Sequence, residues 1–263
     1  MLTKKLLLYS LLCFILILGA DPFLQGKAAN REELVIAAAS SLTDVLSELA
    51  EKYEEAHPEI DILFNFGATG ALQTQIEQGA PVDIFVGASI DNLKTLMKKD
   101  LVALGSFKVL CRNNLVMVVR PGLRFDKNSS FSSLTTPAIK RIAIGDPAYV
   151  PAGKYGMELL KKLNLDQLVQ SKLIFASNVR QALAWVEAGE VDAALVYSTD
   201  VKTSNKVTMI AQAAPNLIDV HYGTVILKRT SKEGIAVDFI KFITGTVGQK
   251  KFQVYGFLPG GDG

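Results

Sequence analysis

Four short stretches of this sequence place hydroxyl-bearing or small residues at the expected start of a helix. A helix start carries unpaired backbone N–H groups and the positive end of the helix dipole, so several starts that meet at one point would enclose an anion. One such stretch is weak support, because Ser, Thr and Asn are also the ordinary capping residues. Their number and similar form predict an anion-binding cage. The stretches are Ser40-Ser41-Leu42-Thr43, Ala68-Thr69-Gly70, Val150-Pro151-Ala152-Gly153 and Ser177-Asn178-Val179.

The residue types at these starts suit an anion that is held without proton exchange. Ser41 and Thr69 offer hydroxyl donors beside backbone N–H groups, while Gly70 and Gly153 let the backbone approach closely. Tyr197 ends an expected strand and adds a phenolic donor, although an ordinary core position fits this tyrosine equally well. Nothing in such a cage titrates near neutrality, so affinity is expected to be nearly flat from about pH 6 to pH 8.

Residues for catalysis or metal binding are sparse. The chain has two histidines, His57 at a helix end and His221 in a strand, and neither has evident partners for a triad or a metal site. The segment 145–154 resembles a phosphate loop, but its spacing to the lysine is too long. Asp192 and Asp200 flank a strand and are interpreted as capping, solvated residues. The sequence therefore predicts no enzyme and no cofactor.

Composition describes an ordinary folded protein of one large or two small domains. The chain has 263 residues, of which 49% are hydrophobic and 21% charged. Its formal charge of +2 falls to zero once Lys4 and Lys5 are removed, and both signs are scattered along the chain. This pattern gives no footprint for nucleic acid.

The N-terminus departs from that composition. A basic start, the apolar run Leu6 to Leu18 and the small residues after it predict a secretory signal peptide over residues 1–29, with an uncleaved membrane anchor as the alternative. The protein is therefore expected in the periplasm or on the extracytoplasmic face. Cys13 lies inside the apolar run, which disfavours a lipid-modified cysteine. Removal of the signal leaves Cys111 alone, so an internal disulfide is not possible.

Apolar runs and helical patterns alternate from residue 34 onward, which predicts α/β architecture with largely parallel sheets covered on both faces. The polar segment 126–137 is predicted as a surface loop. The expected strands are 34–39, 60–66, 82–88, 115–119, 141–144, 173–175, 193–196 and 220–227, and the expected helices are 42–57, 69–78, 90–98, 154–163, 179–188, 232–244 and 247–255.

The repetition of this pattern predicts two lobes. Lobe I is expected to contain residues 30–112 and 221–263, and lobe II residues 113–220. Two crossing strands, near 111–119 and 218–227, would join the lobes and leave a cleft between them, where small ligands bind.

Several motifs occur together and in order. They are Ala37-Ala38-Ala39-Ser40-Ser41-Leu42-Thr43, Gly67-Ala68-Thr69-Gly70-Ala71-Leu72, the segment 75–85 with its Gly-Ala-Pro-Val-Asp, Gly145-Asp146-Pro147 with Val150-Pro151-Ala152-Gly153, and Val196-Tyr197-Ser198-Thr199-Asp200. From about Leu34 to Phe257 the chain resembles the periplasmic molybdate-binding protein of the molybdate ABC importer. The combination is far more specific than any single motif.

This resemblance implies a two-lobed type II periplasmic-binding-protein fold that captures molybdate, and usually tungstate, by hydrogen bonds alone. It also implies a membrane permease as partner and a monomer, with the metal present only in the bound oxyanion. Lys154 and Arg180 are expected to point away from the ligand. The implied ligand residues are Ser41, Thr69, Ala152, Val179 and Tyr197, with Ser40, Gly70 and Gly153 as supporting amides or alternates.

Two alternatives stay open at this point. A sulfate-type oxyanion-binding protein would differ in anion size rather than charge, which residue types do not reveal. An enzyme acting on a small anionic substrate would need a general base in the cleft, and the sequence nominates none.

Overall fold

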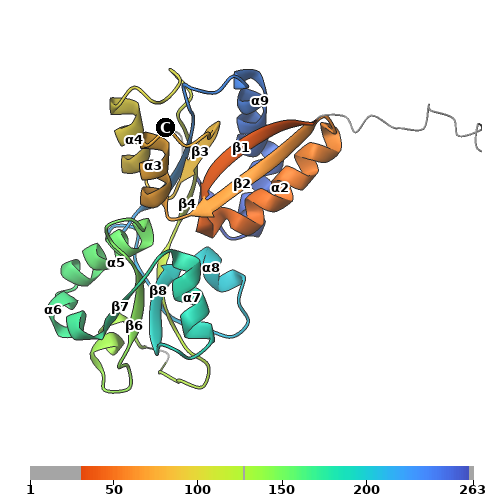
Figure 1. Ribbon diagram of the computed structural model, residues 1–263. Coiled ribbons are helices and arrows are strands. Elements are labelled where there is room, and N and C mark those ends of the chain that lie inside the picture. The colour runs from red at the N-terminus through yellow and green to blue at the C-terminus, as the bar shows by residue number, and fades with distance from the viewer. Residues whose placement is uncertain (1–30, 127, 261–263) are drawn as a thin grey trace, which may run out of the picture.

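The computed structural model describes residues 31–126 and 128–260, which form two α/β lobes (Figure 1). The signal peptide predicted for residues 1–29, with Cys13 inside it, lies outside the described residues. In the described part of the chain, no helix is both long and apolar enough to cross a bilayer.

The first lobe is built on a six-stranded mixed sheet. Its strand order is β11-β4-β10-β3-β1-β2, in which β2, β1 and β3 are parallel and β10 runs antiparallel to β3 and β4. The strands are β1 (Glu32–Ala39), β2 (Ile60–Gly67), β3 (Ile84–Gly87), β4 (Lys108–Asn113), β10 (Val220–Ile226) and β11 (Leu258–Pro259).

Helices cover both faces of this sheet, as alternate side chains along β1 show. Ile36 belongs to the core on one face, together with residues of α2, α9 and α10, whereas Ala37 belongs to a second cluster with Leu72 and Leu93 of α3 and α4. The helices are α2 (Thr43–Ala56), α9 (Glu233–Thr244), α10 (Thr246–Val254), α3 (Thr69–Glu77) and α4 (Ile90–Lys98).

The second lobe contains a five-stranded mixed sheet of order β7-β6-β8-β5-β9. Strands β7, β6 and β8 are parallel, and β5 pairs antiparallel with β8 and β9. The strands are β5 (Leu115–Val119), β6 (Ile142–Gly145), β7 (Leu173–Ala176), β8 (Ala193–Tyr197) and β9 (Thr208–Gln212). The helices are α5 (Pro151–Lys162), α6 (Asp166–Val169), α7 (Val179–Glu187) and α8 (Ser198–Lys202), with 3-10 turns η3 (Phe131–Thr135) and η4 (Gln170–Lys172).

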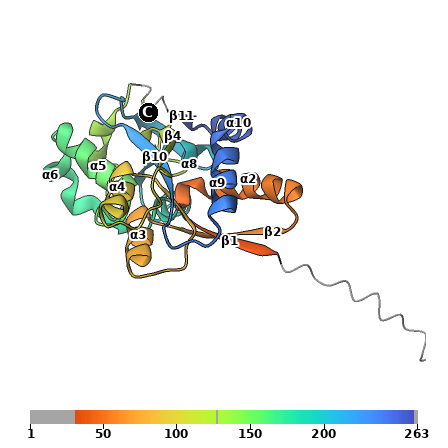
Figure 2. The same ribbon diagram turned by 90° about the horizontal axis from the view of Figure 1, so that it is seen from above.

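The chain crosses between the lobes twice. It leaves the first sheet where β4 ends at Asn113 and enters the second where β5 begins at Leu115; it returns between β9 and β10. Strands β4 and β10 lie side by side in the first sheet (Figure 2). The predicted lobe limits at 112/113 and 220/221 fall beside these crossings and stay a prediction.

Several predicted elements need correction. Helix α5 begins at Pro151, three residues earlier than expected, because proline fits the first helical position, where its missing N–H costs nothing. The predicted loop 126–137 contains the turn η3, whose Phe131 and Leu134 are buried. The short elements β4, β9, β11, α6 and α8 were not predicted, because their few residues carry little periodicity.

Candidate functional site

The four predicted helix starts meet at one small pocket between the lobes. The 3-10 turn η2 (Ser40–Leu42) follows β1, and α3, α5 and α7 follow β2, β6 and β7, so each start lies beyond the carboxyl end of a parallel strand. The pocket is small and is lined by residues of both lobes. Its lining residues are Ala39, Ser40, Ser41, Gly67, Ala68, Thr69, Ala88, Val150, Pro151, Ala152, Val179 and Tyr197.

The first lobe contributes two buried hydroxyl groups. Ser41 lies on η2 and its Oγ is 2.9 Å from Tyr222 Oη. Thr69 is the first residue of α3, and its Oγ1 accepts a hydrogen bond of 3.1 Å from the Ala88 N–H. The Thr69 N–H itself has no acceptor among the described residues. This side of the pocket therefore offers hydroxyl and amide donors together.

The second lobe contributes backbone amides from two helix starts. Pro151 occupies the first position of α5, which leaves the N–H of Ala152 at the pocket. Helix α7 is capped by Asn178, whose Oδ1 accepts from the Gln181 N–H at 3.0 Å and leaves the Val179 N–H untouched. Within the described ranges neither the Ala152 nor the Val179 N–H has an acceptor, so both are available to a ligand.

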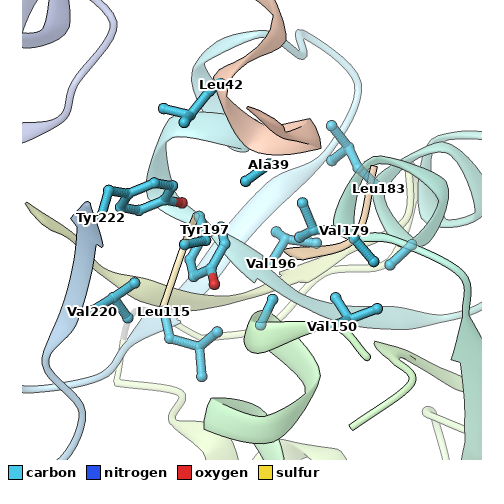
Figure 3. Packing of buried hydrophobic residues seen from close by; sticks show 14 of the residues in the cluster. Ala39, Leu42, Leu115, Val150, Val179, Leu183, Val196, Tyr197, Val220 and Tyr222 are labelled. Atoms are coloured by element: carbon cyan, nitrogen blue, oxygen red, sulfur yellow. The ribbon is translucent and has the colours of Figure 1, made fainter. Parts of the chain in front are cut away.

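Tyr197 adds a third hydroxyl group at the end of β8. The residue is 1% exposed, and its Oη has no partner among the residues that the structure describes. Burial raises the pKa of this phenol well above its usual range, so it stays protonated at neutral pH. Figure 3 shows Tyr197 beside Tyr222, with Ala39, Val150 and Val179 close by. An unpartnered buried hydroxyl is costly, which makes it a natural contact for a ligand.

The two cations next to the helix starts are engaged elsewhere, as predicted. Lys154 Nζ lies 3.2 Å from Asp91, and an Arg180 Nη donates to Asp44 at 2.6 Å. Arg180 Nε also lies 3.0 Å from Asp200 Oδ1, an ion pair without the angle of a good hydrogen bond. The Lys154–Asp91 and Arg180–Asp44 pairs join the two lobes. No charged side chain lines the described pocket.

Asp200 differs from its sequence interpretation. It does cap α8, by accepting from the Tyr197 N–H at 3.0 Å, but it is fully buried rather than solvated. Burial raises the pKa of Asp200 to about 6 against the opposing effects of Arg180 and of that N–H bond, while the charge of Asp44 adds to the increase. The Asp200 carboxyl, bonded to the Tyr197 N–H, therefore titrates near pH 6, the lower limit of the range over which the affinity was expected to be nearly flat.

The backbone amides of Gly70 and Gly153, predicted as supporting donors, are each bonded to a backbone carbonyl. The Gly70 N–H donates to the Tyr149 carbonyl at 2.8 Å, across the lobes, and the Gly153 N–H donates to the Val150 carbonyl at 2.9 Å. Neither residue lines the pocket. A Cβ on Gly70 would lie 2.7 Å from the Tyr149 oxygen, so this glycine serves close contact between backbones. Ser40, the predicted alternate, does line the pocket.

Neither histidine is at the pocket. His57 stacks on Tyr53 with ring centroids 4.3 Å apart, and His221 Nε2 lies 2.8 Å from an Asp219 carboxylate oxygen. Over the described ranges, no group of three or more His, Cys, Asp or Glu residues is arranged to hold a metal ion. The pocket is thus a neutral set of donors, which can bind an anion through charge-assisted hydrogen bonds.

Three residues were not anticipated from the sequence: Ala88, which lines the pocket, and Tyr222 and Asn113 behind it. Tyr222 and Ala88 contact the hydroxyl groups of Ser41 and Thr69, and Asn113 contacts Tyr222. No local motif marks them, because they reach the site only through sheet pairing and lie far from their partners along the chain.

Two lobes that enclose a buried, uncharged set of hydrogen-bond donors define a solute-binding protein. The model of one protein family, described as bacterial extracellular solute-binding protein, matches residues 34–258. The chain belongs to this family.

Named relatives agree with this assignment. A Bacillus subtilis protein, YvgL, named as an ABC transporter substrate-binding lipoprotein, is 37% identical over 94% of this chain and 95% of its own length. The molybdate-binding protein ModA of Haemophilus influenzae is 36% identical over 87% of this chain and 91% of its own length. A solved substrate-binding domain assigned to a molybdenum ABC transporter of Clostridium difficile is 34% identical, with a TM-score of 0.66, over 86% of this chain and 98% of that domain.

Proposed function

We propose that this protein captures molybdate outside the cytoplasm and delivers it to the membrane permease of an ABC importer. The relatives named for molybdate and molybdenum support this ligand. The observation that carries the proposal is the uncharged pocket, in which three hydroxyl groups and several free helix-start amides converge from both lobes. Such a set suits a tetrahedral dianion, and tungstate, with the same shape and charge, is proposed as a second ligand.

Five residues are proposed to hold the oxyanion. They contribute side-chain hydroxyls or, for the two apolar residues, only the backbone N–H. Ser40 remains the alternate to its neighbour because it lines the same pocket. No general base is proposed, and the protein is not proposed to be an enzyme. The five are Ser41, Thr69, Ala152, Val179 and Tyr197.

Three further features belong to the proposal. Export depends on the signal peptide at residues 1–29, the boundaries between lobes fall at 112/113 and 220/221, and the protein acts as a monomer. The sequence prediction against a lipid anchor concerns Cys13, outside the described residues, and stays a prediction beside the lipoprotein name of the Bacillus relative.

The proposal is tested by parallel calorimetric titration of the mature protein with molybdate, tungstate, sulfate and phosphate. Trp185, the single tryptophan, is half-buried on α7, the helix whose start carries the Val179 N–H. Molybdate and tungstate are expected to change its fluorescence and to raise the melting temperature, because ligand binds only the folded state and closes the lobes. A response to phosphate equal to that of molybdate would count against the assignment, and a preference for sulfate would favour the sulfate-type alternative.

The pH dependence of molybdate affinity is expected to follow the protonation of the Asp200 carboxyl. A bound dianion repels the Asp200 carboxylate, so the complex holds more protons than the free protein near the carboxyl pKa of about 6. Affinity is therefore expected to be flat above about pH 7 and to rise about 3- to 10-fold as the pH falls through 6, until the ligand itself gains protons.

Titrations between about pH 5.5 and pH 8 check this expectation, with Asp200→Asn as the variant in which the rise disappears. The charged neighbours of Asp200 are Arg180 and Asp44. A loss of affinity through pH 6 with a ligand that stays unprotonated would show that the sign is wrong.

A further inference from the structure

A buried chain of hydrogen bonds runs from the pocket through both crossing strands. Ser41 Oγ lies 2.9 Å from Tyr222 Oη on β10, and Asn113 Nδ2, at the end of β4, lies 3.3 Å from the same Tyr222 oxygen. Asn113 Nδ2 also donates to Thr199 Oγ1 on α8 at 2.8 Å. These hydrogen bonds thus connect the Ser41 hydroxyl of the first lobe with Thr199 of the second lobe, through the strands β10 and β4.

The side-chain amide of Asn113 fixes which atoms donate and which accept along this series of hydrogen bonds. Its Oδ1 accepts from the Asn114 backbone N–H at 2.9 Å and from the Ser198 hydroxyl at 3.0 Å. A backbone N–H can only donate, so the oxygen and nitrogen of the Asn113 amide are unambiguously assigned. The amide nitrogen must then donate, which means that Tyr222 Oη accepts from Asn113.

The Asn113 amide also determines which atom donates in the hydrogen bond between Tyr222 and Ser41. A phenol has one hydrogen, and Tyr222 is fully buried, with Phe257 packed edge-on against its ring at 5.5 Å. Among the described residues its hydroxyl has only two hydrogen-bond partners, Asn113 Nδ2 and Ser41 Oγ, and Asn113 Nδ2 can only donate. The Tyr222 hydrogen is therefore paired only if it points to Ser41 Oγ. Ser41 therefore accepts from Tyr222, and its own hydrogen is left for the pocket.

We propose that Tyr222, oriented by Asn113, is a positioning residue that makes Ser41 a hydrogen-bond donor to the bound oxyanion. This inference rests on the proposed function, and it specifies that the ligand oxygen at Ser41 carries no hydrogen. Thr69 is fixed in the same sense, because the Ala88 N–H can only donate to its Oγ1. The Ser41 and Thr69 hydroxyls therefore act as donors toward the pocket and favour ligand oxygens that carry no hydrogen, as in molybdate. Hydrogen phosphate carries a hydroxyl, which needs an acceptor that these two residues do not offer.

The test is a double-variant cycle of Tyr222→Phe with Ser41→Ala, read as molybdate affinity by calorimetry. Tyr222→Phe removes one hydroxyl behind the pocket and is expected to weaken molybdate about 3- to 10-fold. In the Ser41→Ala background the same change is expected to have less than about a 2-fold effect, because Tyr222 acts through the Ser41 hydroxyl. Tyr255→Phe is the matched control, since the Tyr255 hydroxyl bonds to Glu48 away from the pocket.

Selectivity gives a second readout that a purely structural role would not change. Without Tyr222 Oη, the Ser41 oxygen is free to accept from a ligand hydroxyl, so the ratio of phosphate to molybdate dissociation constants is expected to fall in Tyr222→Phe and to stay at the wild-type value in Tyr255→Phe.

Each outcome decides between the inference and the function on which it rests. Equal losses from Tyr222→Phe in both backgrounds, or no loss in either, would overturn the positioning role. Unchanged binding in Ser41→Ala alone would instead remove Ser41 from the site and contradict the proposed ligand set. If Tyr222→Phe does not fold, Asn113→Ala takes its place, with the same expected dependence on Ser41 and the same overturning result.

Discussion

Replacing Ser41 with alanine or Thr69 with valine is expected to weaken molybdate binding about 10- to 100-fold. Each variant removes one hydroxyl donor to a dianion in a buried pocket, and a charge-assisted hydrogen bond contributes roughly 1.5 to 3 kcal/mol. Both side chains are almost completely buried, so water does not replace the lost bond well. Calorimetric titration of each purified variant measures the effect.

Both variants are expected to lower stability, because each removes the acceptor of one buried donor. Thr69→Val leaves the Ala88 N–H without its acceptor and costs about 1–3 kcal/mol of the unfolding free energy. Ser41→Ala removes the acceptor of the buried Tyr222 hydroxyl, which keeps only its bond from Asn113, and is expected to cost a similar amount. Ser132→Ala and Thr135→Val, on exposed positions of η3, are the matched controls for binding. Wild-type affinity in both pocket variants would place these residues outside the site.

Gly153→Ala is expected to disrupt the pocket without touching a proposed ligand atom. A Cβ at this position would lie 1.9 Å from the Gly145 carbonyl oxygen, and the next nearest atoms also belong to the Gly145 and Asp146 backbone, which cannot move aside as a side chain can. The start of α5 must shift, and the neighbouring Ala152 N–H shifts with it. We expect a loss of about 1–3 kcal/mol in stability and at least about a 10-fold loss of molybdate affinity.

Gly234→Ala provides the control for this change. Gly234 lies in α9, and a Cβ there meets nothing within 4 Å. Alanine is the better helix former, so this variant is expected to bind molybdate normally and to be up to about 1 kcal/mol more stable. Chemical denaturation and calorimetry of the two variants side by side measure both quantities. Normal binding by Gly153→Ala would mean that the Ala152 N–H is not a ligand.

Local patterns in the sequence determined most of the longer elements and the positions of the helix starts along the chain. Apolar runs such as Leu115 to Val119, which is β5, predict buried strands because both faces of each sheet are covered. Thr69 and Val179 mark helix starts correctly, since capping preferences are local and act within a few residues. The predicted donors Ser41, Ala152 and Tyr197 lie in the same pocket for the same reason, each at the end of its strand or the start of its helix.

Tertiary structure alone decided which of these donors are free and how they are oriented. The Gly70 N–H looked available from its position, but the Tyr149 carbonyl of the other lobe occupies it. Asp200 follows a strand end, as solvated capping residues often do, yet it is fully buried and its pKa is raised. Such facts depend on packing between lobes, which no local pattern encodes.

The orientation of Ser41 shows the limit of sequence reasoning most clearly. Its partner Tyr222 is 181 residues away, and Asn113, which sets the direction of the bond, stands on yet another strand. Helix capping and strand periodicity act over a few residues and therefore specify where a donor lies along the chain. The direction in which a hydroxyl points depends on the donors and acceptors that the folded sheets bring around it, and only the tertiary structure supplies those.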